Sequence, residues 1–152
     1  MKKIALITLL FATMAFTGIS AQTNVYVANP SGNAINTYKT SLKNYFNDVL
    51  GGFSTVSLVA PNTVADSILQ QITIDRNNRK VSAQYLTDVA SISGTDKVCY
   101  TIIDERNGRL NVEAMLINCS TGNVEKILSQ SISRSVNDIR TLVQIFSKKL
   151  FF

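Results

Sequence analysis

An asparagine–glycine pair, Asn107–Gly108, separates two runs of residues that carry the pattern of β-strands. Such a pair favours the two-residue turn whose twist matches that of a hairpin. In the second run, Leu110–Asn118, apolar residues alternate with polar ones, and a strand turns successive side chains to opposite faces of its sheet. The sequence therefore predicts a hairpin of Lys97–Asp104 and Leu110–Asn118 whose sheet has at least one buried face.

The register of this hairpin also decides how the two cysteines of the chain lie. A two-residue loop places Arg106 opposite Arg109 and Cys99 opposite Leu116. Cys119, three residues further along, then points to the other face of the sheet. A loop one residue longer puts both cysteines on one face but about 13 Å apart, whereas a disulfide needs Cα atoms within about 7 Å. We expect two free thiols, with Cys99 buried or half-buried and Cys119 at a strand end.

The rest of the chain alternates further helices and strands. Apolar residues recur at three- and four-residue spacing in four segments, which predicts helices over about 33–50, 62–73, 81–92 and 136–150. Short β-rich runs predict strands over 25–28, 53–60 and 124–133. The apolar stripe of the first helix includes Ile35 and Phe46, and Asn62 or Thr63 should cap the second helix. Residues 75–80 are expected to be a polar break.

This order, β-α-β-α-α-β-β-β-α, predicts an α/β (mixed α+β) fold with one mixed five-stranded sheet packed by helices. The first strand–helix–strand unit should be a right-handed parallel crossover. The sequence shows no linker, no repeat and no sign of a second domain. We therefore expect residues 22–152 to form a single domain, since domains of about 100–150 residues are the commonest.

Residues 1–21 have the layout of a secretory signal peptide that is cleaved after about Ala21. Two lysines precede an almost unbroken apolar run over 4–16, and small residues precede Gln22. The run is shorter than the roughly 20 residues that a membrane-spanning helix needs, and no second long apolar segment follows. A lipoprotein signal requires a cysteine where Gln22 stands. The sequence therefore predicts a periplasmic or secreted protein without an integral membrane span.

The charge of the chain argues against nucleic acid as a partner. The formal charge is +5, and removal of Lys2 and Lys3 with the signal lowers it to +3. Nucleic-acid binding requires a clustered basic stripe. Basic residues gather in only two places: Arg76, Arg79 and Lys80, and Lys148 and Lys149. Such runs are usually solvated, and the alternative is a docking patch for an acidic partner or an anionic lipid surface.

The chain contains no histidine, which excludes more chemistry than any other feature of its composition. Ser–His and Cys–His catalytic pairs, histidine metal ligands and histidine pH switches are ruled out. The glycines match neither a Walker nor a dinucleotide-binding pattern. Asp88, Asp104 and Glu113 are the carboxylates left as candidates for a glycosidase-type pair. We expect no catalytic residue, no cofactor and no metal, and hence a protein that is not an enzyme.

Three segments of the chain resemble a family of cell-envelope domains. They are a helix–strand–helix over 42–71, the loop Ser93–Gly94–Thr95–Asp96 that leads into a strand, and two strands across a Thr-Gly turn over 110–127. Together they are similar to the domain shared by curli-secretion lipoproteins (CsgG type), penicillin-binding-protein activators (LpoB type) and the amino-terminal domain of TolB. The resemblance covers most of residues 25–150, and it rests on element order and short motifs.

The resemblance implies a non-enzymatic envelope module that binds another envelope protein. Relatives commonly carry a lipid on a cysteine, and Gln22 occupies that place here. The curli pore adds membrane hairpins for which the 131 residues after the signal leave no room. The resemblance therefore implies neither a pore nor a particular partner.

We accordingly expect an exported adaptor or activator that binds another envelope protein, with self-association into a homo-oligomer also open. The contact surface should be an exposed sheet edge, the first or the last strand, because unpaired edges invite strand addition. The terminal aromatics could fray, complete the core or dock a partner. Candidate contact residues are Arg76, Arg79, Lys80, Lys148, Lys149, Phe151 and Phe152. The alternative is a soluble periplasmic protein that binds a small ligand between its sheet and helices.

Overall fold

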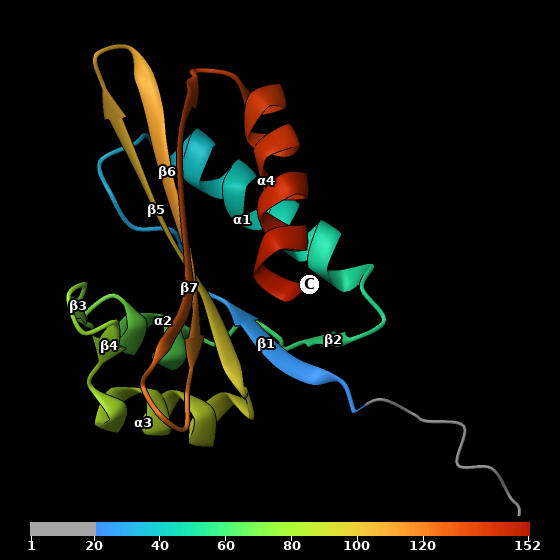
Figure 1. The fold of residues 1–152 in the computed structure, drawn as a ribbon, viewed down its shortest axis with the longest axis vertical. Coiled ribbons are helices and arrows are strands. Elements are labelled where there is room, and N and C mark those ends of the chain that lie inside the picture. The colour runs from blue at the N-terminus through green and yellow to red at the C-terminus, as the bar shows by residue number, and fades with distance from the viewer. Residues whose placement is uncertain (1–20) are drawn as a thin grey trace, which may run out of the picture.

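A computed structural model describes residues 21–152, so the expected signal peptide, apart from Ala21, lies outside the described part of the chain. Figure 1 shows the elements in chain order. The strands are β1 (Thr23–Val27), β2 (Val56–Leu58), β3 (Ile74–Asp75), β4 (Lys80–Val81), β5 (Lys97–Arg106), β6 (Arg109–Asn118) and β7 (Val124–Ser133). The helices are α1 (Asn36–Gly51), α2 (Thr63–Leu69), α3 (Ala83–Ser93) and α4 (Val136–Phe151).

The predicted mixed five-stranded sheet is confirmed, with strand order β2-β1-β5-β6-β7. β1 pairs in parallel with β2 and β5, and the remaining pairs are antiparallel. Arg106 lies opposite Arg109 and Cys99 opposite Leu116, as the two-residue loop predicted. Asn107 and Gly108 have φ angles of 52° and 73°, the left-handed pair that this hairpin turn requires.

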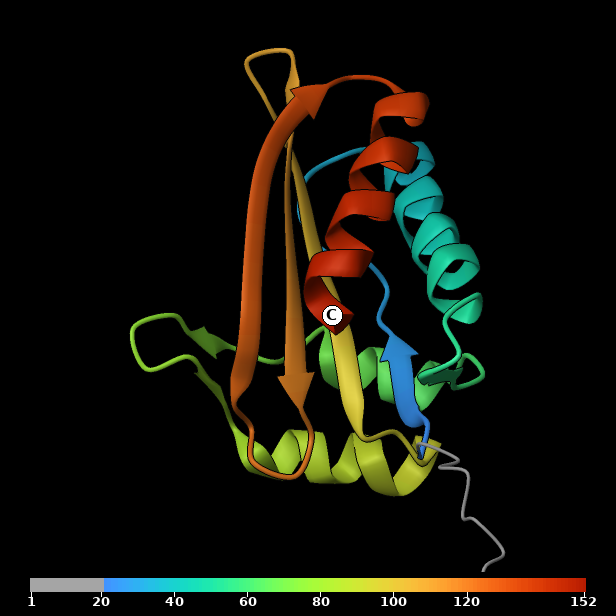
Figure 2. The ribbon, with the colours of Figure 1, turned by 45° about the vertical axis from the view of Figure 1, so that its right-hand side comes forward.

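Two hydrophobic cores lie on the two faces of the sheet. The helices α1 and α4 cover one face, and α2 and α3 cover the other at its lower end in Figure 2. Phe46 of α1 and Phe146 of α4 are buried in the first core. Leu86 of α3 packs with Met115 of β6 in the second. Burial on both faces explains why β5 and β6 are apolar along most of their length.

The loop over 28–34 runs along β5 and completes the hydrogen bonding of that strand. The N–H of Ser31 donates to the carbonyl of Thr101 at 3.0 Å, and the N–H of Ile103 donates back to Ser31 at 2.9 Å. The N–H of Ala34 donates to Ile103 at 3.1 Å. The side of β5 that extends beyond β1 is therefore already covered by this loop.

A buried tyrosine connects β1 to α2. The hydroxyl of Tyr26 accepts a hydrogen bond from the N–H of Asn62 at 3.0 Å and lies 2.9 Å from Asp66 Oδ1. The hydroxyl donates a hydrogen bond to this carboxylate oxygen of Asp66. Burial raises the pKa of Tyr26 to about 12. The side chain of Asn62 also accepts from the N–H groups of Val64 and Ala65, which confirms the predicted cap of this helix.

Two local expectations are wrong. The expected polar break over 75–80 is a small hairpin, β3–β4, whose turn is closed by Asp75 Oδ1 accepting from the N–H groups of Asn77 and Asn78. Ile35 is 56% exposed instead of buried, because α1 begins at Asn36 and leaves Ile35 ahead of the first helical turn.

Within residues 21–152 no helix combines the length and apolarity that crossing a membrane requires.

Candidate binding surface

The sheet has two outer strands of unequal length. β2 contributes three residues to one edge, whereas β7 contributes ten to the other. The expectation that the first strand forms an edge is wrong, because the crossover through α1 places β2 on the outer side of β1. The last strand is an edge, and in the described chain β7 pairs along its length with β6 alone. β7 is therefore the long open edge of the sheet.

The chain itself closes both ends of this edge. At the lower end, the N–H of Val124 donates to the carbonyl of Arg79, and the N–H of Val81 donates to Gly122, both at 2.8 Å. The β3–β4 hairpin thus covers the start of β7, as Figure 2 shows. At the upper end, the carbonyl of Ser133 accepts from the N–H of Ser135 at 2.8 Å. The middle of β7 remains open between these contacts.

The hairpin register shows which backbone groups of β7 face outward. Residues opposite each other across a two-residue turn exchange hydrogen bonds, so the backbone of Arg109 faces β5 and that of Leu110 faces β7. Leu110 lies opposite Ile132, and the alternation repeats every two residues. The intervening residues of the middle of β7 direct their N–H and C=O groups to the free edge: Ile127, Ser129 and Ser131.

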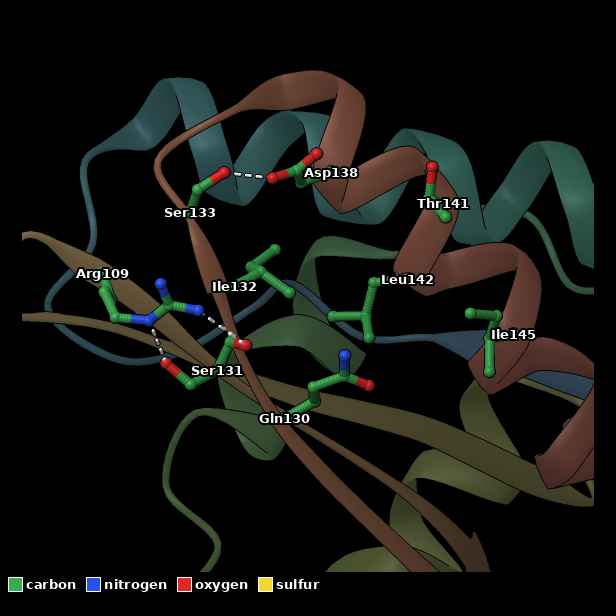
Figure 3. Close-up of a pocket in the computed structure, with 9 residues that line it drawn as sticks. All are labelled: Arg109, Gln130, Ser131, Ile132, Ser133, Asp138, Thr141, Leu142 and Ile145. Atoms are coloured by element: carbon green, nitrogen blue, oxygen red, sulfur yellow. Dashed lines mark hydrogen bonds between the residues drawn. The ribbon is translucent and has the colours of Figure 1, made fainter.

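A groove of about 350 Å³ runs between the upper half of β7 and α4 (Figure 3). Ile145 of α4 is 42% exposed on its wall, and the largely buried Leu142 and Ile132 lie deeper. Arg109 reaches over β7, where its Nε donates to Ser131 Oγ at 2.9 Å and its Nη2 donates to the Ser131 carbonyl at 3.2 Å. The groove therefore joins an open strand edge, an apolar wall and one arginine.

The basic residues of the β3–β4 hairpin have separate places. Arg76 forms a two-pronged ion pair with Glu113 of β6, with both N–O distances at 2.6 Å. This pair holds the hairpin against the sheet. Arg79 has a left-handed φ of 50°, and its side chain and that of Lys80 are exposed. Arg76 thus has a structural partner, whereas Arg79 and Lys80 remain candidate contacts.

The carboxyl-terminal candidates lie on α4 and just after it, on the other face of the sheet from that hairpin. Lys148 and Lys149 are exposed on its last turn. Phe151 is half-buried and packs against the first core. Phe152 is 74% exposed, and its ring meets that of Phe53 edge-on with centroids 5.1 Å apart. None of these residues lines the groove beside β7.

The two terminal aromatics should differ in their effect on stability. Phe151→Ala is expected to lower the free energy of unfolding by about 1–3 kcal/mol because a partly buried ring leaves the core. Phe152→Ala should cost less than about 1 kcal/mol, the scale of a single aromatic pair. Urea denaturation followed by circular dichroism measures both values. An equal loss in the two variants would contradict the packing described for Phe151.

Both cysteines are free and buried, on opposite faces of the sheet, as the register predicted. Burial raises the pKa of the Cys99 thiol to about 12. Burial, with a smaller contribution from the negative charge of Asp96, raises that of Cys119 to about 11. The reactive thiolate is therefore scarce at neutral pH in both side chains.

This burial predicts slow thiol chemistry in the native protein. At pH 8 a thiol of pKa about 11 holds roughly a hundredth of the thiolate of one with an ordinary pKa, so modification of Cys119 should slow at least a hundredfold. Cys99 should not react before unfolding. The absorbance released from Ellman's reagent follows the reaction, and the protein in guanidinium chloride is the control in which both thiols react. Rapid modification of either thiol in the native state would refute the assignment.

Of the three carboxylates considered for catalysis, two have partners within the fold and one is exposed on a helix. Glu113 is paired with Arg76, and Asp104 Oδ1 accepts from the N–H of Asn33 at 2.8 Å. Asp88 is exposed on α3. Within residues 21–152 no three acidic or cysteine side chains are grouped so as to hold a metal ion. None of the three carboxylates lines the groove beside β7 or the other hollows described below.

Other hollows of the surface bear on the small-ligand alternative. One of about 480 Å³ lies between the end of α3 and the β6–β7 turn, and one of about 440 Å³ lies beside Lys39 and Lys43 of α1. A third, of about 300 Å³, lies near Phe152. Both of the first two hollows are open to solvent, whereas a drug-sized ligand is usually largely enclosed by its site.

The overall fold has counterparts among solved structures, although neither a protein-family model nor a curated protein sequence matches the chain. Lipoprotein GNA1162 from Neisseria meningitidis matches with a TM-score of 0.54 at 16% identity, over 84% of this chain and 95% of that one. The LpoB C-terminal domain from Escherichia coli matches with a TM-score of 0.54 at 13% identity, over 77% and 87%.

The PelC dodecamer from Paraburkholderia phytofirmans matches with a TM-score of 0.55 at 14% identity, over 85% of this chain and 87% of that one. Identities this low relate the chains by fold alone. The resemblance found in the three sequence segments is confirmed at that level. The chain has the LpoB-like fold that GNA1162 and PelC share.

Proposed function

We propose that this chain is an exported, non-enzymatic module of the cell envelope that binds another envelope protein through the open edge of β7. The observation that carries the proposal is the contrast between the edges. Within residues 21–152 every other long strand edge is covered by a neighbouring strand or by the loop over 28–34. Among these long strands, only the middle of β7, at 127–131, directs backbone groups outward without a backbone partner, and it lies beside a groove. Such an edge is a ready template for strand addition.

The proposed location in the cell envelope rests on two further observations. The expected signal peptide directs export, and GNA1162, one of the proteins with this fold, is described as a lipoprotein. Another, PelC, is described as a dodecamer, so the fold is compatible with self-association. A second copy of this chain is therefore the competing occupant of the edge.

Affinity capture with matched variants tests the proposal. Ser129→Pro removes an outward N–H from the middle of β7, and proline is tolerated where an edge N–H faces solvent. Ser129→Thr keeps the N–H and is the control. From envelope extract of the source organism, the wild type and the threonine variant should capture the same protein in a stoichiometric amount, and the proline variant should lose it at least tenfold. Equal capture by all three would overturn the proposed use of β7.

A further inference from the structure

The middle of β7 and its groove restrict what kind of partner segment fits. We infer that the partner enters as a short extended segment that adds a strand beside 127–131, with apolar side chains at alternate positions toward α4 and a carboxylate that reaches Arg109. This inference rests on the proposed function, because it names the partner chemistry for the same edge.

The closed ends of the edge fix the length of the added strand. The β3–β4 hairpin occupies the backbone of Val124, and Ser135 occupies the carbonyl of Ser133. The backbone groups left for a partner belong to Ile127, Ser129 and Ser131. Pairing with these three alternate residues requires about five to seven residues of the incoming segment, since a partner strand runs residue by residue along the edge.

The wall formed by α4 fixes the side-chain pattern. In a strand added to this edge, every second side chain points to the face that carries α4, and the others point to the opposite face. On the α4 face they meet the exposed Ile145, with Leu142 and Ile132 behind it. The polar Gln130 and Thr141 line the groove beside this apolar wall. On the opposite face they meet Ser129 and Ser131, which are small and polar. An alternation of apolar and polar residues satisfies both faces, because it buries apolar side chains only where there is an apolar wall.

Arg109 determines the charge that the partner segment should carry. In the free protein its guanidinium donates to the carbonyl and hydroxyl of Ser131. An incoming N–H that pairs with this carbonyl displaces the guanidinium, and a carboxylate is its best new partner because the two form paired, charge-assisted hydrogen bonds. Within residues 21–152 Arg109 has no carboxylate partner of its own, whereas Arg134, next to its cross-strand neighbour Ser133, is paired with Glu105 at 3.1 Å.

The charged side chains near Arg109 are compatible with a partner carboxylate at this position. Asp138, the acidic residue that lines the groove, accepts from the hydroxyl of Ser133. Arg106 lies directly opposite Arg109 in the hairpin and adds a second positive charge at this end of the sheet, yet it does not line the groove. Arg106 is therefore a control of equal charge for any test of Arg109.

A library of random nine-residue peptides displayed on phage, selected on the immobilised exported protein, tests the inference. The selected peptides should alternate apolar and polar residues and carry an aspartate or glutamate at one fixed position. Binding of these peptides should fall at least tenfold in Arg109→Glu and change less than threefold in Arg106→Glu. It should also fall at least tenfold in Ser129→Pro and persist in Ser129→Thr, and circular dichroism verifies that each variant is folded.

The outcomes separate this inference from the proposed function. Selected peptides without alternation or without a carboxylate, or equal effects of the two arginine variants, would overturn the partner chemistry while leaving β7 as the binding edge if Ser129→Pro still abolishes binding. Peptides that bind Ser129→Pro as well as the wild type, or no enrichment at all, would overturn the inference itself. The capture experiment with envelope extract then decides separately whether the proposed function stands.

Discussion

Replacing Gly32 with alanine should destabilise the protein by about 3 kcal/mol or more, the largest loss that we expect from the addition of one methyl group. Gly32 has a φ of +103°, outside the range that alanine adopts readily. A Cβ atom at this position would lie 2.3 Å from the carbonyl oxygen of Ile103, a backbone atom that is itself hydrogen-bonded. The loop over 28–34 would have to leave β5.

Gly94→Ala is the matched control for this substitution. Gly94 also has a left-handed φ, +71°, but a Cβ there meets nothing within 4 Å. Its expected cost is about 1–2 kcal/mol, that of the backbone conformation alone. Urea denaturation of both variants measures the difference. A loss for Gly32→Ala no larger than that for Gly94→Ala would mean that the loop does not hold β5 as described.

Replacing Phe46 with alanine should lower the free energy of unfolding by about 3–5 kcal/mol, the range measured for large aromatic residues in protein cores. Phe46 is fully buried between α1, α4 and the sheet, where the removal of its ring leaves a cavity. Urea denaturation again measures the change. The slope of the unfolding free energy against urea concentration should be the same in the variant and the wild type, so that a shifted midpoint reports a change in stability.

Ile35→Ala provides the comparison on the same segment, since both residues were expected on the buried stripe of the first helix. Ile35 is 56% exposed, so its truncation should cost less than about 1 kcal/mol. Comparable losses in the two variants would contradict the position at which α1 begins.

The fold was predictable wherever local chemistry determines the backbone. Asn107–Gly108 accept the left-handed φ angles of a hairpin turn, so the register of β5 and β6 followed from two residues. Asn62 caps α2 with its own side chain. The β3–β4 hairpin was missed because its two-residue strands are too short to show alternation, and its stability comes from distant contacts such as Arg76 with Glu113.

The candidate binding surface was predictable only in part. The last strand was expected as an edge, and it is one. The groove residues Ser131, Asp138 and Ile145 belong to no motif. A serine in a strand predicts only that its side chain faces solvent, which is common on any outer strand. Their proximity depends on how α4 folds back over β7, which no local pattern reports. The basic and aromatic candidates chosen from the sequence lie away from the groove for the same reason.

Photo-crosslinking in intact cells tests the use of β7 most directly. A photoreactive amino acid placed at Ser129 lies on the open edge, and the same amino acid placed at Ser67, exposed on α2, is the control. We predict that irradiation joins the Ser129 variant to one other envelope protein and that the Ser67 variant forms no such product. The absence of a product from Ser129, the same product from both positions, or a product consisting of two copies of this chain would contradict the account.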